Sequence, residues 1–330
     1  MEKPVEGEAV SESREGCETT VIRSPVHSTF HTMTAVVLWL GTIHLNLVVL
    51  GLAFLFSSSS TMILLLIGLM VLLAVGPVDE ESRLGKAIVR YICEHGLGYF
   101  PVTVHIEDIK AFHSNQAYVL AVEPHSVFPI SCLPLLNITG TMPWSKTKAL
   151  ASNAVFYTPF LRQLGTWQGL IPVTKNNFVK HLEAGYSCIV IPGGVREIMY
   201  MNPAHEVAFL KSRQGFVRVA IETGRPLVPV FSFGQTNVYR WWKPEGKLYV
   251  RIARAIRFAP LLFWGAFGSP IPYRRPMHVV VGRPIEVKQN LTPSVEEVAE
   301  VHARFITDLE QLFHRHKAAA GHADADLKIV

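Results

Sequence analysis

The stretch Ala117-Tyr118-Val119-Leu120-Ala121-Val122-Glu123-Pro124-His125-Ser126 places an apolar run directly before a loop that carries a histidine. Residues 117–122 are almost continuous in apolar side chains, which is typical of a strand buried on both faces. In open α/β sheets the loops at the C-termini of the strands build the site. His125 is therefore a candidate general base, because an imidazole with a pKa of about 6.5 can accept and return a proton near neutrality. Pro124 is expected to fix the direction of the loop, although an isolated histidine at such a place can also simply cap a turn.

Short apolar runs of the same kind recur beyond residue 77, separated by helical stretches. The further strand candidates are Val102 to Ile106, Ser187 to Ile191, Leu227 to Phe233 and Met277 to Val281. The helical candidates are Asn176 to Ala184, Ala204 to Thr223 and Val295 to His314. The first two of these helices are each followed by a glycine, which is a common helix end. The alternation predicts an α/β domain over residues 79–330 with a largely parallel sheet.

A second loop with polar residues follows the expected strand at residues 187–191. It reads Pro192-Gly193-Gly194-Val195-Arg196-Glu197, and a parallel sheet would bring it to the same edge as His125. The two glycines allow backbone N–H groups to approach a ligand oxygen closely. Arg196 could pair with a phosphate, and Glu197 could orient the histidine. Without such a partner, a Pro-Gly-Gly sequence is most often just a tight turn.

Basic side chains gather in a later segment, around Gly215. Lys211 and Arg218 lie on one face of the expected helix with Arg213 nearby, and Lys175 opens an earlier helix. These groups could bind phosphates through charge-assisted hydrogen bonds. The alternative is an ordinary solvated basic face.

The composition indicates contact with a membrane and with anionic partners. Of the 330 residues, 49% are hydrophobic and 17% are charged, and the net charge is +5. Since soluble domains usually carry about 25% charged residues, this chain has more apolar surface than a water-soluble core requires. The positive charge suits nucleic acid, lipid head groups or a phosphorylated substrate. Arginines at 251, 254 and 257, followed by an apolar run, suit the membrane interface, and no nucleic-acid motif accompanies them.

Several chemistries lack the sequence motif that they need. The cysteines Cys17, Cys93, Cys132 and Cys188 form no C-x-x-C pair, so neither a zinc site nor a disulfide framework is indicated. No H-E-x-x-H, Walker A or G-x-G-x-x-G motif occurs, so metals and nucleotide cofactors are not expected. Ser126 beside His125 does not indicate a serine hydrolase, because the G-x-S-x-G elbow is absent.

Two apolar runs near the N-terminus predict a membrane hairpin over residues 32–78. Ala35 to Phe56 has 22 residues without a formal charge, which at ~1.5 Å per residue can cross a hydrocarbon core of about 30 Å. Thr61 to Val75 is shorter, and only four serines separate the two runs, so both ends should lie on one side. The alternatives are a buried core hairpin of a soluble protein and a shallow, partly re-entrant hairpin.

The flanks of the two runs set the expected topology. Basic residues stand before the first run at Arg14 and Arg23 and after the second at Arg83, Lys86 and Arg90. This balance puts both flanks and both termini in the cytosol. Residues 1–31 are rich in Glu, Ser and Thr and are expected to form a disordered cytosolic tail. The sequons at Asn137 and Asn290 should then stay unmodified, because they would be glycosylated only in the lumen.

Residues 213–234, RQGFVRVAIETGRPLVPVFSFG, form the longest informative block of the chain. This block resembles that of the type 2 diacylglycerol O-acyltransferase family, and of plant or algal members in particular. The matching positions are Arg213, Gly215, Phe216, Arg218, Ala220, Gly224, Leu227, Val228, Pro229, Phe233 and Gly234. E-P-H-S at 123–126 is similar to the plant form of a block that reads H-P-H-G in animal members, and Tyr99-Phe100-Pro101 and P-G-G-x-x-E at 192–197 also fit. Residues 326–330, DLKIV, are similar to hydrophobic endoplasmic-reticulum retrieval ends of the family.

The resemblance implies a glycerolipid-acyltransferase-like α/β domain with a largely parallel sheet, preceded by an N-terminal transmembrane helical hairpin. The implied reaction transfers a fatty acyl group from acyl-CoA to 1,2-diacylglycerol, with acyl-CoA as co-substrate, no cofactor, no metal and no acyl-enzyme. The implied location is the endoplasmic reticulum membrane, as a multi-pass protein, or the lipid droplet surface. The alternative functions are acylation of monoacylglycerol or a long-chain (wax) alcohol, and a non-catalytic lipid-droplet or lipid-binding role. Whether the chain forms homo-oligomers stays open.

The wider glycerolipid acyltransferase superfamily uses a histidine, four residues and then an aspartate that orients the histidine. Here that position is Ile130, so by analogy we expect Glu197 to replace the missing carboxylate. The expected catalytic residues are His125, Glu197 and Glu123. The expected substrate-binding residues are Pro124, Ser126, Lys175, Gly193, Gly194, Arg196, Arg213, Gly215 and Arg218. Backbone N–H groups near Gly193 and Gly194 are expected to stabilise the oxyanion.

Overall fold

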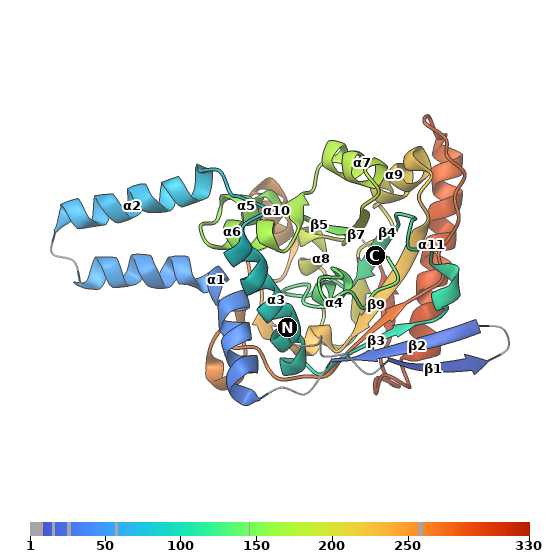
Figure 1. Ribbon diagram of the computed structural model, residues 1–330, viewed down its shortest axis with the longest axis horizontal. Helices are drawn as coiled ribbons and strands as arrows, with labels where there is room; N and C mark the ends of the chain where they lie inside the picture. The colour runs from blue at the N-terminus through green and yellow to red at the C-terminus, as the bar shows by residue number, and fades with distance from the viewer. Residues whose placement is uncertain (1–8, 15–16, 25–27, 57–58, 145, 257–259) are drawn as a thin grey trace.

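The computed structural model describes residues 9–14, 17–24, 28–56, 59–144, 146–256 and 260–330. Within these residues, nine strands form one sheet in the order β1-β2-β3-β12-β9-β4-β7-β5-β6 (Figure 1). The strands are β1 (Ala9–Arg14), β2 (Cys17–Arg23), β3 (Val102–Ile106), β4 (Val119–Glu123), β5 (Thr147–Ala151), β6 (Leu170–Pro172), β7 (Ser187–Val190), β9 (Leu227–Phe233) and β12 (Met277–Val281). From β9 to β6 all neighbours are parallel. β3 and β12 are parallel to each other, whereas β12 is antiparallel to β9 and β2 to β3. The predicted largely parallel sheet is confirmed.

Helices cover both faces of this sheet (Figure 1). They are α3 (Arg83–Tyr99), α4 (Cys132–Leu135), α5 (Asn153–Tyr157), α6 (Leu161–Trp167), α7 (Lys175–Glu183), α8 (Val195–Ile198), α9 (Gly215–Thr223), α10 (Lys247–Ile256) and α11 (Val295–His316). Successive residues of β4 alternate between two cores, with Leu120 and Val122 on the side of α3 and Val119 and Ala121 on the side of α7, α9 and α11. β4, β7 and β9 are buried along their whole length, which explains their continuous apolar sequences.

Two apolar helices, α1 (Thr29–Phe56) and α2 (Ser60–Val75), project from the body and lie alongside each other (Figure 1). The first part of α1 packs beside α3, with Val36 and Leu40 buried. Beyond this part, large apolar side chains of both helices are exposed, which is unfavourable in water and typical of a surface that meets lipid. In the part of the chain that the structure describes, α1 is the one helix long and apolar enough to cross a membrane, while α2 is apolar but shorter.

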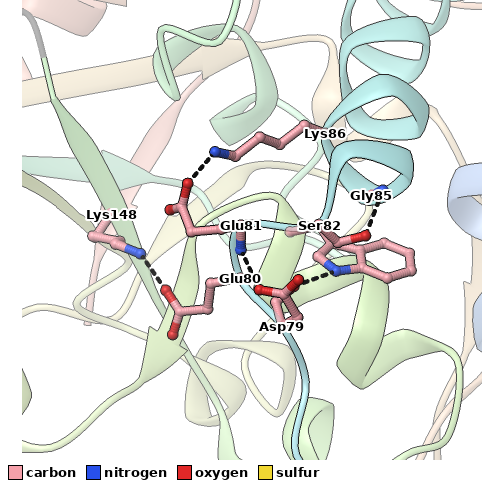
Figure 2. A network of polar contacts seen from close by, with 8 residues as sticks. Asp79, Glu80, Glu81, Ser82, Gly85, Lys86 and Lys148 are labelled. Carbon is pink, nitrogen blue, oxygen red and sulfur yellow. Dashed lines mark hydrogen bonds and ion pairs between the residues drawn. The ribbon is translucent and has the colours of Figure 1, made fainter.

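The segment that joins α2 to α3 is fixed to the sheet by polar contacts. Figure 2 shows Glu80 accepting a hydrogen bond from Lys148 of β5, at 3.2 Å. Trp167 of α6 donates from its indole N–H to the carbonyl of Asp79 at 3.0 Å. A Cβ on Gly85 would collide with the ring of Trp167, so glycine allows α3 and α6 to meet here. The two apolar helices are thus attached to the sheet edge formed by β5 and β6.

The described part of residues 1–31 is not a disordered tail, which corrects that prediction. It contains β1, β2 and the first turn of α1. Thr20 to Arg23 pair with β3 in an antiparallel register that sets Thr20 opposite Ile106. The run Thr19 to Ile22 is entirely β-branched, which favours an extended strand once a partner strand is available.

The remaining element predictions fall into two groups. All five predicted strands, and the helices at 175–183 and 295–316, lie within two residues of the expected bounds. The helix expected over Ala204 to Thr223 begins only at Gly215, because residues Glu206–Ala208 form β8 instead. β8 pairs in parallel with β13 (Leu327–Ile329), so the segment predicted as a retrieval end has a partner within the fold. β10 (Arg240–Trp242) and β11 (Leu262–Trp264) form a further small sheet.

Candidate active site

The loops that follow β4 and β7 meet at one edge of the sheet, because these two strands pair in parallel. The first loop carries His125 and the second leads into α8. The N–H of Gly193 donates to Oε1 of Glu123 at 3.3 Å, and the N–H of His125 donates to Oε1 of Glu197. Each loop therefore supplies a carboxyl group that holds the backbone of the other.

Glu123 and Glu197 are both fully buried. Burial, and then the adjoining carboxyl of Glu197, raise the pKa of Glu123 well above its usual value, which favours its neutral form. Glu197 accepts a second hydrogen bond, from the N–H of Phe209 to Oε2 at 3.0 Å. A Cβ on Gly193 would collide with the Glu197 carboxyl, so the close packing of the two loops requires glycine there.

The imidazole of His125 is oriented by a backbone carbonyl. Its Nδ1 lies 2.8 Å from the carbonyl oxygen of Ser126. Since a carbonyl can only accept, Nδ1 is the donor, and in the neutral ring the lone pair is therefore on Nε2. The expectation that Glu197 orients the ring is corrected: Glu197 binds the backbone N–H of His125. The N–H of His125 is directed at the second loop, whereas the ring lines a cavity. The carboxyl group of Glu197 therefore binds the backbone of His125 and not its ring.

This cavity has a volume of about 740 Å³, and its lining has an apolar and a polar part. The apolar part includes Trp39, Leu40 and Ile43 of α1 and apolar side chains of α4, β5 and β7. The polar part consists of His125, Gly193, Gly194 and Arg196 from the two loops and of Arg213, which lies between β8 and α9. The apolar helix α1 therefore lines the same cavity as a histidine and two cationic groups.

Arg196 and Arg213 both line the polar part of the cavity, close enough for their charges to interact. Nε of Arg213 donates to the carbonyl of Pro192 at 2.6 Å. Burial, and then the neighbouring Arg196, lower the pKa of Arg213, while Glu123 opposes this shift. Arg196 is exposed and lines the cavity. Two cations held side by side attract an anionic group such as a phosphate.

The comparison with known protein families decides the class of this protein. The profile described as "Diacylglycerol acyltransferase" matches residues 53–330. The chain belongs to the diacylglycerol acyltransferase family. The matched region contains both loops, the two arginines and most of the cavity lining, so the family assignment and the site concern the same part of the molecule.

Curated relatives in the diacylglycerol acyltransferase family act on different acceptors, as their names state. Human 2-acylglycerol O-acyltransferase 3 is 32% identical over 248 residues, which cover 68% of this chain and 70% of the relative. Mouse acyl-CoA wax alcohol acyltransferase 2 is 31% identical over 69% of this chain and 73% of its own. Diacylglycerol O-acyltransferase 2 of Dictyostelium discoideum is 30% identical over 70% of this chain and 75% of the relative. Among solved structures, the 1-acyl-sn-glycerophosphate acyltransferase PlsC of Thermotoga maritima is similar with a TM-score of 0.41 and 12% identity, over 86% of this chain and 95% of that one.

Three of the predicted substrate-binding residues lie away from the cavity in this diacylglycerol acyltransferase family member. Nζ of Lys175 is 2.8 Å from the carboxylate of Glu222, and Nη1 of Arg218 donates to the carbonyl of Pro293 at 3.0 Å. Gly215 is an exposed residue at the start of α9. Among the described residues, the cavity lining includes none of the three. The side chains of Lys175 and Arg218 instead link α7 to α9 and α9 to the segment before α11.

Two further residues hold the site and were not predicted. Phe209 acts through its backbone N–H, for which the side-chain sequence carries no signal. Gln235 contacts the His125 loop through its side chain. The rule that strand C-termini build the site could have found Gln235, because it follows β9, and β9 pairs in parallel with β4.

Proposed function

We propose that this diacylglycerol acyltransferase family protein transfers a fatty acyl group from acyl-CoA to the free hydroxyl of 1,2-diacylglycerol, giving triacylglycerol and CoA. The observation that carries the proposal is the cavity, which connects α1 to His125 and to the Arg196–Arg213 pair. Its apolar length suits acyl chains, and its cationic end suits the phosphates of CoA. The thioester carbonyl would then lie beside the imidazole.

In the proposed mechanism His125 acts as the general base. Its Nε2 takes the proton of the acceptor hydroxyl as the oxygen attacks the thioester carbonyl, because a hydroxyl is too weak an acid to ionise first. The same nitrogen then returns the proton to the departing thiolate of CoA. Two backbone N–H groups were predicted to stabilise the oxyanion. The N–H of Gly193 instead donates to Glu123, so we assign this role to the N–H of Gly194, which lines the cavity. One such donor contributes about 3 to 4 kcal/mol to the stability of the transition state in comparable sites.

The two nucleophilic side chains near His125, Cys132 and Ser126, are both poorly suited to form an acyl-enzyme, which supports direct transfer. Burial raises the pKa of the Cys132 thiol to about 12, which leaves little thiolate at neutral pH. The hydroxyl of Ser126 is buried and donates to the carbonyl of Gln235 at 3.4 Å. Neither group is prepared to attack a thioester.

The proposed setting is the endoplasmic reticulum membrane, with α1 and α2 as a hairpin and both flanks in the cytosol, or the monolayer of a lipid droplet. A lipid acceptor would enter the cavity beside Trp39, Leu40 and Ile43 of α1, while acyl-CoA reaches Arg196 from water. The sequon side chains support cytosolic placement of the domain, since Nδ2 of Asn137 donates to the Trp144 carbonyl and Nδ2 of Asn290 donates to Glu297. Glycan on Asn137 in cells would reverse this orientation.

The acceptor is tested with purified protein, labelled acyl-CoA and a panel of diacylglycerol, monoacylglycerol and long-chain alcohol. Formation of triacylglycerol at the highest kcat/KM is the expected result. A preference for monoacylglycerol would instead give this protein the activity named for the 2-acylglycerol relative, and a preference for the long-chain alcohol the activity named for the wax alcohol relative. His125→Ala should abolish turnover and leave membrane insertion intact. Absence of transfer to every acceptor would favour a non-catalytic lipid-binding role.

A further inference from the structure

The buried side-chain amide of Gln235 joins two points of the His125 loop. Gln235 opens η2 (Gln235–Asn237), one residue beyond the end of β9, and is 1% exposed. Its Nε2 donates to the carbonyl of Pro124 at 2.5 Å, and its Oε1 accepts from the N–H of Ser131 at 2.8 Å. Its own backbone carbonyl accepts from the hydroxyl of Ser126 at 3.4 Å. One residue therefore contacts the loop on both sides of His125.

The chemistry of these contacts fixes which side chain can make them. The carbonyl of Pro124 can only accept, and the N–H of Ser131 can only donate, so the side chain between them must offer one donor and one acceptor. A neutral amide does this, as does a protonated carboxyl group. An ionised carboxylate offers no donor, and a leucine of similar size offers neither. A carboxylate would therefore leave the carbonyl of Pro124 without its partner inside the protein, and leucine would leave both backbone groups without one.

The loop needs such support because its backbone is strained beside the histidine. Ser126 has a φ of 57°, a left-handed conformation that residues other than glycine adopt at a cost. Such conformations persist only where the surrounding structure holds them. Glu197 holds the N–H of His125 from the side of the second loop, and Gln235 holds the carbonyl of Pro124 from the side of β9.

We propose that Gln235 is a positioning residue for acyl transfer, which keeps Nε2 of His125 directed into the cavity. This inference rests on the proposed function, in which Nε2 removes the acceptor proton. A loop that loses its Gln235 contacts still binds acyl-CoA at the arginines but presents the base in the wrong place. Gln235 therefore acts on kcat and not on the KM for acyl-CoA.

The test compares Gln235→Leu with wild type and with Ser232→Ala, per mole of folded enzyme. Ser232 lies three residues earlier, on β9, and is equally buried, and within the described residues its hydroxyl has no hydrogen-bond partner. Gln235→Leu should lower kcat by about tenfold or more with the KM for acyl-CoA nearly unchanged, since small displacements of a catalytic group have effects of this size. Ser232→Ala should keep the wild-type kcat. A wild-type kcat in Gln235→Leu, or a loss that lies wholly in KM, overturns the proposal.

Gln235→Glu supplies a second readout that a purely structural role would not produce. A buried glutamic acid donates to Pro124 while it is protonated and loses that donor when it ionises. The ratio of Gln235→Glu activity to wild-type activity should therefore fall as the pH rises from 6 to 9. A flat ratio overturns the proposal, and this holds even if Gln235→Leu fails to fold. Wild type without any acyl transfer would defeat the proposed function itself, whereas active wild type with an unaffected Gln235→Leu defeats the role of Gln235 alone.

Discussion

Glu197 holds His125 by its backbone: Oε1 of Glu197 accepts a hydrogen bond from the N–H of His125, and Oε2 accepts one from the N–H of Phe209 at 3.0 Å. Both carboxyl oxygens are therefore occupied by backbone donors. The imidazole is left to the carbonyl of Ser126, 2.8 Å from Nδ1. In this protein the carboxyl group of Glu197 therefore fixes the position of the His125 loop, whereas the carbonyl of Ser126 selects the tautomer of the ring.

Glu197→Gln should lower both stability and kcat. An amide has a single acceptor oxygen, so one of the two N–H groups would face an NH2 group. An unsatisfied buried donor costs ~1–3 kcal/mol, which should appear as a lower Tm in thermal unfolding. Steady-state kinetics with acyl-CoA should show the loss mainly in kcat. Unchanged Tm and kcat would mean that the two hydrogen bonds do not hold the loop.

Glu123→Gln should behave differently, although the two glutamates adjoin each other. Burial and the carboxyl of Glu197 raise the pKa of Glu123, which favours its neutral form, and an amide resembles that form. The variant keeps the acceptor for the N–H of Gly193. Its Tm and kcat at pH 7 should stay close to those of wild type. An inactive Glu123→Gln would show that the site needs an ionised Glu123.

Gly193→Ala should damage the site, while Gly215→Ala should not. A Cβ at Gly193 would collide with the carboxyl of Glu197, and overpacking of this kind costs ~1–3 kcal/mol. A Cβ at Gly215 meets no atom within 4 Å, and alanine in a helix is more stable than glycine by about 0.5–1 kcal/mol. Both glycines belong to the sequence blocks that match the family. Comparing the two variants therefore shows whether the loss comes from the steric contact or from replacing any glycine of these blocks. Equal loss of kcat in both variants would contradict the packing argument.

The strands and the meeting of the two loops could be predicted from sequence because their signals are local. The apolar runs at 117–122 and 187–191 each mark a buried strand, and parallel pairing then brings His125 and Glu197 to one edge. The atoms that touch could not be predicted. Whether Glu197 binds the ring or the N–H of His125 depends on the direction of a single peptide group, which no residue pattern encodes.

Contacts between distant segments account for the predictions that were wrong. β8 forms because residues 327–329 pair with it, a partner more than a hundred residues away that local periodicity does not show. Lys175 carries the right charge for a phosphate, but α9 places Glu222 beside it. Charge identifies a group that can bind an anion, and only the fold decides which anion it meets.

Arg196→Gln should raise the KM for acyl-CoA, whereas Lys175→Gln should not. Arg196 lines the polar part of the cavity, and a hydrogen bond to a charged group contributes ~1.5–3 kcal/mol, or about tenfold or more in affinity. Lys175 pairs with Glu222 outside the cavity. The KM for the lipid acceptor should be unchanged in both variants. An equal rise in the KM for acyl-CoA with Lys175→Gln would return that residue to the binding site.

Glu206→Gln should remove a pH-dependent part of the stability. Burial raises the pKa of Glu206 from about 4.5 to about 7; Thr236 donates to its Oε1 at 2.7 Å, and its buried Oε2 has no partner in the described part of the chain. The folded state therefore binds this proton more tightly than the unfolded state. The resulting stability is complete below the unfolded pKa and is lost as the pH rises through about 7.

The measurement is urea unfolding of both proteins in detergent across this pH range. The difference in unfolding free energy between Glu206→Gln and wild type should grow in favour of the variant as the pH rises, by on the order of 3 kcal/mol. Thr236→Val should move the transition to higher pH, because the threonine hydroxyl stabilises the ionised carboxylate. A difference that stays constant from acid to alkaline pH would show that Glu206 titrates like an exposed carboxylate.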